Sequence, residues 1–257
     1  MRGFKHFSSI FPSLVVATLF ALASASVAAW DWGWGAKITG SGTIKTEARS
    51  VSGFTGISLA VPATADIVQG TSEGISIETD DNILPLIETV VDGGHLKIHF
   101  KDRNMSVSTK TLKMTINVKT IDSLSVAGSG DLRAAKLQAA KLKTSIAGSG
   151  DVRIASLDAD TLTLSIAGSG DFSAGGKANT VEAKIAGSGD IKIEKLAAND
   201  VKLSIAGSGD AKVWAKDTLK VSVAGSGDVA YYGDAKVTQS VAGSGSVKRL
   251  GSAPAGG

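Results

Sequence analysis

Cysteine is absent from the 257 residues of this chain. Its absence excludes a disulfide framework, a lipid-modified N-terminal cysteine, and a thiolate acting as a nucleophile or metal ligand. Aromatic residues are scarce, at 5% of the chain, so there are few rings on which bases or sugars can stack. Three of the four tryptophans, Trp30, Trp32 and Trp34, crowd one short segment, which we expect to form an N-terminal cap rather than a sticky arm.

The N-terminus has the pattern of a secretory signal peptide. Arg2, Lys5 and His6 precede an apolar run over residues 11–22, which is followed by small residues at 23–29. A charged start, a short apolar stretch and a small-residue cleavage site define such signals, and we expect cleavage after Ala28 or Ala29. The apolar run is shorter than the roughly 20 residues that span a bilayer. We therefore predict a signal peptide over residues 1–29 and no membrane span after its removal; an uncleaved anchor is the alternative.

A strong charge of either sign is also lacking. The formal net charge is +3, and loss of Arg2 and Lys5 with the signal peptide leaves 25 basic against 24 acidic residues. A nucleic-acid-binding protein carries a clear basic excess on its domain. We therefore expect no nucleic acid among the partners.

One phrase, Gly-Ser-Gly-Asp, recurs through the second half of the chain. Its first glycine stands at positions 128, 148, 168, 187, 207, 225 and 243, in steps of 20, 20, 19, 20, 18 and 18 residues, and in the last copy Ser246 replaces the aspartate. Self-similarity at a period near twenty is typical of solenoids. The fold class predicted is therefore all-β, a parallel β-helix-like solenoid with coils of 18–20 residues over 123–250, followed by a flexible tail over 251–257.

Within each copy the apolar residues alternate, which predicts strands with one buried face on either side of a glycine corner. One copy cannot bury its own inward residues, so copies are expected to stack in parallel register. Two internal ladders follow. The first contains Val126, Ile146, Ile166, Ile185, Ile205, Val223 and Val241, and the second contains Leu132, Val152, Phe172, Ile191, Ala211, Val229 and Val247.

The outward positions repeat equally regularly and present small side chains. A column of serines, interrupted by Lys184, lies beside a column of alanines. Stacking these columns predicts a flat, low-relief surface. The interaction strip predicted on it contains Ser145, Ala147, Ser165, Ala167, Ser204 and Ala206.

The aspartates of the repeat form a predicted column of like charges: Asp131, Asp151, Asp171, Asp190, Asp210 and Asp228. At a coil spacing of about 4.8 Å, neighbouring carboxylates repel by about 3 to 4 kcal/mol at an effective dielectric near 20. Four explanations remain open for what offsets this repulsion: backbone amides of the glycine corner, basic residues two positions on (Arg133, Arg153, Lys192, Lys212), splaying of the carboxylates into solvent, or bound cations. Calcium-binding β-rolls need a nonapeptide period and a doubled glycine. Because both are missing, we predict no metal and keep a calcium ladder on these six aspartates as the alternative.

No catalytic or cofactor motif is recognisable. The corner serine is flanked directly by glycines, unlike the G-x-S-x-G nucleophile, and no G-K-[ST] ending makes the corner a phosphate loop. His95 and His99 should share one strand face, but no acidic cluster accompanies them in the sequence. We therefore predict no catalytic residue, no cofactor and no enzyme activity.

Residues 30–122 lack the strict repeat but keep strand signals. Alternating segments bounded by glycine, proline, asparagine or aspartate occur at 56–61, 65–70, 74–79, 95–99 and 112–118. Residues 82–87 are expected to form one helical turn. This half is predicted to be either an all-β cap or irregular coils of the same solenoid.

Several phrases occur in a specific order along most of the chain. They are residues 49–57, 66–70, 80–85 and 92–98, followed by the Gly-Ser-Gly-Asp repeats. In this order the sequence resembles the autotransporter adhesin family with a head GIN domain. The resemblance implies a β-helix-like domain on an exported bacterial protein, and it supplies no agreed catalytic residues.

The function expected is that of an exported, non-enzymatic binding or adhesion module. The interaction strip or an open solenoid end would contact an unknown protein or glycan partner at the cell envelope, in the periplasm, at the surface or outside the cell. Whether the protein forms a homo-oligomer stays open. The alternatives are a glycan-active β-helix enzyme and a passive structural envelope protein.

Overall fold

The computed structural model describes residues 37–102 and 104–254. The predicted signal peptide and the tryptophan cluster lie outside them. The described part is nearly all strand and contains no α-helix; its one helical element there is the 3-10 turn η1 (Leu84–Leu86), where the sequence predicts a helical turn. Within these residues no helix is long and apolar enough to cross a membrane.

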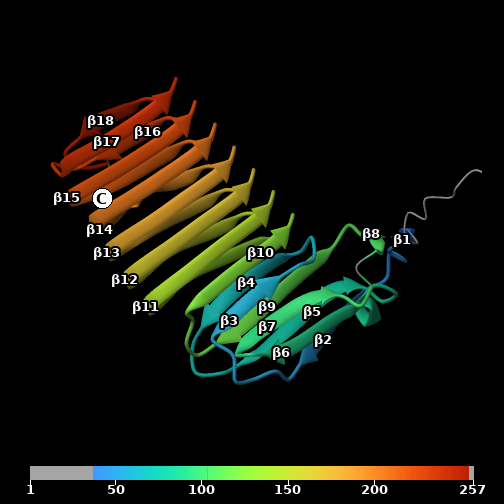
Figure 1. The fold of residues 1–257 in the computed structure, drawn as a ribbon. Coiled ribbons are helices and arrows are strands. Elements are labelled where there is room, and N and C mark those ends of the chain that lie inside the picture. The colour runs from blue at the N-terminus through green and yellow to red at the C-terminus, as the bar shows by residue number, and fades with distance from the viewer. Residues whose placement is uncertain (1–36, 103, 255–257) are drawn as a thin grey trace, which may run out of the picture. The chain divides into compact units, whose positions relative to one another are not determined.

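The repeats form the predicted solenoid of parallel strands (Figure 1). Successive strands pair in register, so that Ile146 lies beside Val126 and Ile166 lies beside Ile146. The strands are β10 (Ser123–Gly128), β11 (Asp131–Gly148), β12 (Val152–Gly168), β13 (Phe172–Gly187), β14 (Ile191–Gly207), β15 (Ala211–Gly225), β16 (Val229–Tyr232), β17 (Lys236–Gly243) and β18 (Val247–Gly251). The all-β solenoid fold predicted from the repeat is confirmed.

Each coil turns three corners rather than the one that the glycine motif predicts. In β11 the buried and exposed residues alternate, but Ala135–Lys136 and Ala140–Lys141 are consecutive exposed pairs. The register between β11 and β12 also skips Ala135 and Ala140. A coil therefore has a first arm (131–134), a second (136–139) and a third (141–148), and the Gly-Ser-Gly-Asp corner joins the third arm to the next coil.

Both predicted ladders form the core. All members up to Val223 and Val229 are at most 2% exposed. Val241 is 38% exposed because β17 has no strand on its outer side among the described residues. It is the one member of the first ladder that does not lie in the core.

The two glycines of each corner serve different purposes. The first has a positive φ, for example +131° at Gly168, which side chains other than glycine rarely adopt. The second, such as Gly170, is buried, and a Cβ there would lie 2.1 Å from the carbonyl oxygen of Gly150 in the preceding coil. Only the second glycine therefore faces inward, since Gly168 is partly exposed.

The N-terminal half combines the two architectures left open by the sequence. The strands β3 (Gly56–Leu59) and β4 (Thr64–Gln69) continue the solenoid register and pair in parallel with β7 (His95–Phe100) and β9 (Leu112–Val118). Antiparallel strands then extend the two stacks at their N-terminal ends: β5 (Gly74–Asp80) pairs with β9 and β2 (Ile44–Arg49) with β5, while β6 (Ile87–Asp92) pairs with β7. The strands β1 (Lys37–Thr39) and β8 (Ser106–Ser108) form a separate pair.

Each end of this stack carries charged or polar residues at inward positions. At the first end, Arg49 donates hydrogen bonds to the carbonyl oxygens of Ile87 (2.7 Å) and Leu84 (3.0 Å). In the last coil, Gln239 stands beside Val221 and Arg249 beside Tyr231, and Arg249 donates to Gly233 O at 2.9 Å. Polar groups at inward edge positions discourage further strand addition. At the end of the described residues, Gly251 ends β18 and Pro254 is buried.

Replacing Ile166 by aspartate tests the ladder. Ile166 is 1% exposed, so Ile166→Asp buries a charge without a partner and should lower the free energy of unfolding by about 4 kcal/mol or more. Ile166→Val is the matched control, with an expected loss of about 1 kcal/mol. Thermal unfolding followed by circular dichroism measures both, and an unchanged midpoint for the aspartate variant would contradict the ladder.

Removing the polar residues from the last coil tests the protected end. The double variant Gln239→Val/Arg249→Val leaves an apolar edge strand and should associate in sedimentation velocity, because exposed apolar edges template strand pairing. The control is Lys141→Val/Lys143→Val, which adds the same residues at exposed positions in mid-solenoid. Equal sedimentation of the two double variants would show that these residues do not protect the edge.

Candidate functional site

The predicted interaction strip lies on the outward face of the third arm. Ser145 pairs with Ser165 and Ala147 with Ala167, in neighbouring coils. The strip alanines 147, 167 and 206 are exposed, while Ser145 and Ser204 are partly exposed. The structure thus brings all six predicted residues to one surface.

Lys184 interrupts the serine column on β13. Its Nζ lies 3.5 Å from Glu182 Oε1, and Lys202 Nζ donates to the same oxygen at 3.2 Å. The hydrogen bond from Lys202, with the positive charges of Lys202 and Lys184, holds the pKa of Glu182 below its usual range. Lys184 is therefore the one long side chain in the serine column, and Glu182 and Lys202 lie beside that column.

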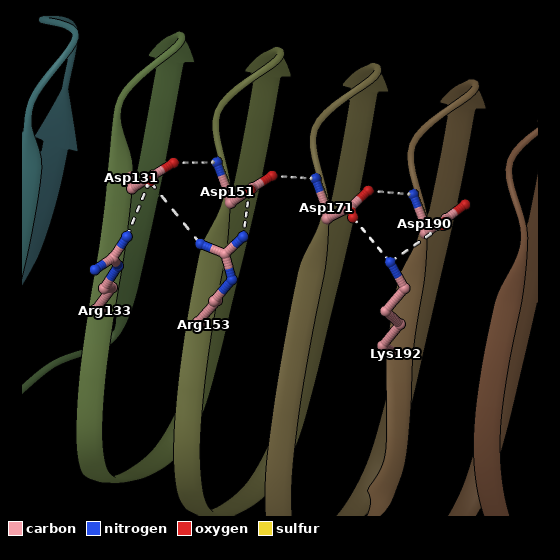
Figure 2. Close-up of polar contacts among 7 residues, drawn as sticks. All are labelled: Asp131, Arg133, Asp151, Arg153, Asp171, Asp190 and Lys192. Atoms are coloured by element: carbon pink, nitrogen blue, oxygen red, sulfur yellow. Dashed lines mark hydrogen bonds and ion pairs between the residues drawn. The ribbon is translucent and has the colours of Figure 1, made fainter.

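The aspartate column is held by backbone amides of the neighbouring coil (Figure 2). The Oδ1 atom of Asp151 accepts the amide N–H of Asp171 at 2.8 Å, and Oδ1 of Asp171 accepts that of Asp190 at 3.0 Å. The same bond recurs up to Asp228, whose Oδ1 accepts both the amide and the hydroxyl of Ser246 at 2.8 Å. Each carboxylate therefore fastens its own coil to the next.

The Oδ2 atoms of the first four aspartates in the column face basic side chains. Arg153 donates to Asp151 Oδ2 at 2.6 Å and lies 3.9 Å from Asp131 Oδ2, while Lys192 lies 2.9 Å from Asp171 and 3.2 Å from Asp190 (Figure 2). The hydrogen bond with Asp171 raises the pKa of Lys192 above its usual value, and partial burial opposes that rise.

Two of the four open explanations for the column therefore have a structural basis. Backbone amides of the next coil bind every carboxylate of the column. Three basic side chains also bind carboxylates of its first coils: Arg133 binds Asp131, Arg153 binds Asp151 and Lys192 binds Asp171. Lys212 makes no ion pair with the column, and Asp210 and Asp228 have no basic partner within residues 37–102 and 104–254. In the same part of the chain no three acidic or histidine side chains are grouped so as to hold a metal ion.

His95 and His99 share the outward face of β7, as predicted. His99 Nε2 lies 3.8 Å from Glu88 Oε2, and its Nδ1 is 3.0 Å from the carbonyl oxygen of Phe100. Lys97, between the histidines, contacts Asp92 and holds the pKa of that carboxyl below its usual range through a hydrogen bond. A pocket of about 430 Å³ lies beside His99 and Phe100, where Ala60 and Ala127 form its low side at the end of the strip.

Residues around one irregular coil were not singled out by sequence reasoning. Glu194 and Lys195 follow the short Gly168–Gly187 step, and they line a hollow with Gly175 and Gly176. The step of 19 residues and the Gly-Gly pair are the signals by which the sequence marks this place. Neither reveals that a groove forms there.

Together, the stacked coils and their repeated outward columns define a β-solenoid protein that presents an extended, periodic surface. The chain belongs to the family described as "Putative auto-transporter adhesin, head GIN domain", whose model matches residues 53–235. The family resemblance seen in the sequence is thereby confirmed.

Solved structures agree with this membership. A protein of Bacteroides fragilis described as a "putative adhesin" is 29% identical, with a TM-score of 0.79 over 83% of this chain and 100% of its own. A protein of Parabacteroides distasonis described as a "putative lipid binding protein" is 26% identical, with a TM-score of 0.72 over 84% of this chain and 100% of its own. A protein of Parabacteroides merdae with a TM-score of 0.68 and 24% identity shares the fold. Among curated proteins, none matches this chain.

Substitution of Asp151 separates its two bonds. Asp151→Ala leaves the Asp171 amide without its acceptor and should lower the free energy of unfolding by about 1 to 2 kcal/mol. Asp151→Asn keeps an oxygen for that amide and loses only the charge facing Arg153, so it should cost less than half as much. Urea unfolding of both variants measures the difference; equal losses would show that the amide bond does not hold the column.

Proposed function

We propose that this protein is an exported, non-enzymatic binding or adhesion module that contacts a protein or glycan at the cell envelope. The observation that carries the proposal is the repeated strip. Successive coils on both sides of Lys184 place the same small outward residues in register, so a partner meets an extended surface instead of a single isolated site. Family membership and the adhesin-like relative support an exported, surface-acting protein.

The strip suits contact with an extended surface for a physical reason. Alanine and serine lose little side-chain entropy when a partner covers them, so ordering the surface costs little on association. The strands beneath are fixed by parallel pairing on both sides, and the strip is therefore rigid before the partner arrives. Preorganisation of this kind favours binding through many weak, repeated contacts.

Bulky residues on the strip test this proposal. The triple variant Ala147→Tyr/Ala167→Tyr/Ala206→Tyr should lower the binding of labelled protein to bacterial cells, matrix proteins or immobilised glycans by about tenfold or more, because the rings prevent close approach. Tyrosine is well tolerated in strands, so the fold should be retained.

The matched control carries tyrosine at Ala140, Asp160 and Asn179, which are exposed at the corner between the second and third arms. If the strip variant has the circular dichroism spectrum of the original protein and binds the same targets as well as the control does, the strip is not the contact surface. Release of reducing ends from any glycan would instead favour a glycan-active enzyme.

A further inference from the structure

Two coils are shortened at the corner between their first and second arms, those of β13 and β15, and β13 is the first of them. The register of β12 with β13 shifts between Ile154 and Leu157, and that of β13 with β14 shifts between Ser173 and Gly175. The pair Gly175–Gly176 makes this tight corner, where Gly176 has a φ of +107° and a Cβ would lie 2.2 Å from Leu157 O. Only glycine fits there, and this corner contains one residue fewer than those of the two adjoining coils.

A groove follows from this shortening. A hollow of about 600 Å³ lies over Gly175 and Gly176 and is bounded by Glu194 and Lys195. A second hollow, of about 470 Å³, shares Ile154, Ala155 and Ser173 with it and reaches Arg133 on β11 and Asp66 on β4. The joined groove crosses five neighbouring strands, β4 and β11 to β14. At about 4.8 Å per strand it is roughly 19 Å long and runs across the strands.

The groove holds a hydrogen-bond acceptor without a donor. Glu194 Oε2 is buried and has no hydrogen-bond partner among the described residues. A buried polar atom left unpaired is costly, and more so when it carries charge. The neighbouring Lys195 is exposed and forms no ion pair within those residues. Glu194 and Lys195 thus border the hollow as an acceptor that lacks a donor and an ammonium that lacks an anion among the described residues.

We propose that this groove binds a linear, hydroxyl-rich chain, a polysaccharide, with its axis along the stack of coils. Glu194 accepts hydrogen bonds from sugar hydroxyls, while Lys195 and Arg133 donate to ring, hydroxyl or carboxylate oxygens of the same chain. The low floor of Ala155, Ser173 and Gly175 admits the sugar rings. The groove lies on the first corner of the coil, whereas the strip lies on the third arm, so this site is separate from the proposed contact surface.

An acidic peptide fits the groove less well, for two reasons. Extended peptides bind by adding a strand to a parallel or antiparallel edge, and this groove crosses strands that are already paired on both sides. Arg133, Arg153 and Lys192 already face aspartates of the column, so among the described residues of the groove Lys195 is the one basic side chain without an ion pair. Hydroxyl groups meet the unpaired acceptor without needing either an edge or a net charge.

The test uses the purified protein on an array of linear tetra- to hexasaccharides, both neutral and uronic-acid-containing, with immobilised polyglutamate alongside. The original protein should be retained by at least one oligosaccharide. Ala155→Phe, which fills the groove where its two hollows join, and Glu194→Ala, which removes the acceptor, should each weaken retention by about tenfold or more. The matched control Ala140→Phe places the same ring at an exposed corner outside the groove and should bind as the original does.

A thermal melt shows which of the two groove variants, Ala155→Phe and Glu194→Ala, is folded. Retention of one folded groove variant, compared with that of the control, is sufficient to test the groove. Retention by no oligosaccharide, or equal retention of the folded groove variants and the control, would overturn the proposal. Retention by polyglutamate that Ala155→Phe abolishes would assign the groove to an acidic chain instead. If the strip tyrosines abolish oligosaccharide binding and the groove variants do not, the glycan binds the strip, which overturns the groove site while supporting the proposed function.

Discussion

The close approach of one glycine corner to the next is the constraint on which the structure depends. The second glycine of each corner leaves no space for a Cβ, since that atom would lie 2.1 Å from the carbonyl oxygen of the equivalent glycine one coil before, as at Gly170 and Gly209. The amides of the corner serine and of the second glycine both donate to the carbonyl oxygen of the first glycine in the preceding coil; Ser169, for example, donates to Gly148 O at 2.8 Å. Backbone thus packs directly on backbone, and every coil is fixed in the same register. The two buried ladders follow, because equivalent apolar residues then lie one above another.

The same register creates an electrostatic problem and supplies its solution. Equivalent aspartates must stand one strand spacing apart, where their charges repel. The corner that aligns them also directs the amide of each aspartate toward the carboxylate of the coil below, as Asp171 does toward Asp151. A hydrogen bond to a charged acceptor is stronger than one between neutral groups, so the column fastens the coils together. The basic partners Arg153 and Lys192 come from the same arm that follows the corner.

Regularity and its interruption supply different surfaces. Where the repeat is strict, small residues such as Ala147 and Ala167 build a uniform strip that can only recognise something extended. Where the β13 coil loses a residue at its first corner, unrepeated side chains such as Glu194 border a hollow. A solenoid can lose a residue at a corner because each coil contacts only its neighbours, so the change remains local and the core ladder continues through Phe172 and Ile185.

The sequence by itself determined the solenoid, because a repeat of 18 to 20 residues makes like residues stack. The ladder from Val126 to Val223, the outward Ser and Ala columns, five of the strands in the N-terminal half and the family all follow from local pattern. The two extra corners per coil escaped it, since exposed pairs such as Ala135–Lys136 carry no turn residue. Contacts between distant segments could not be predicted from the sequence either. Arg49 bonds to Leu84 and Ile87, and Lys192 reaches Asp171 whereas Lys212 pairs with no aspartate of the column. Only tertiary structure decided these and the groove beside Glu194, because each depends on where neighbouring coils place atoms that local sequence does not connect.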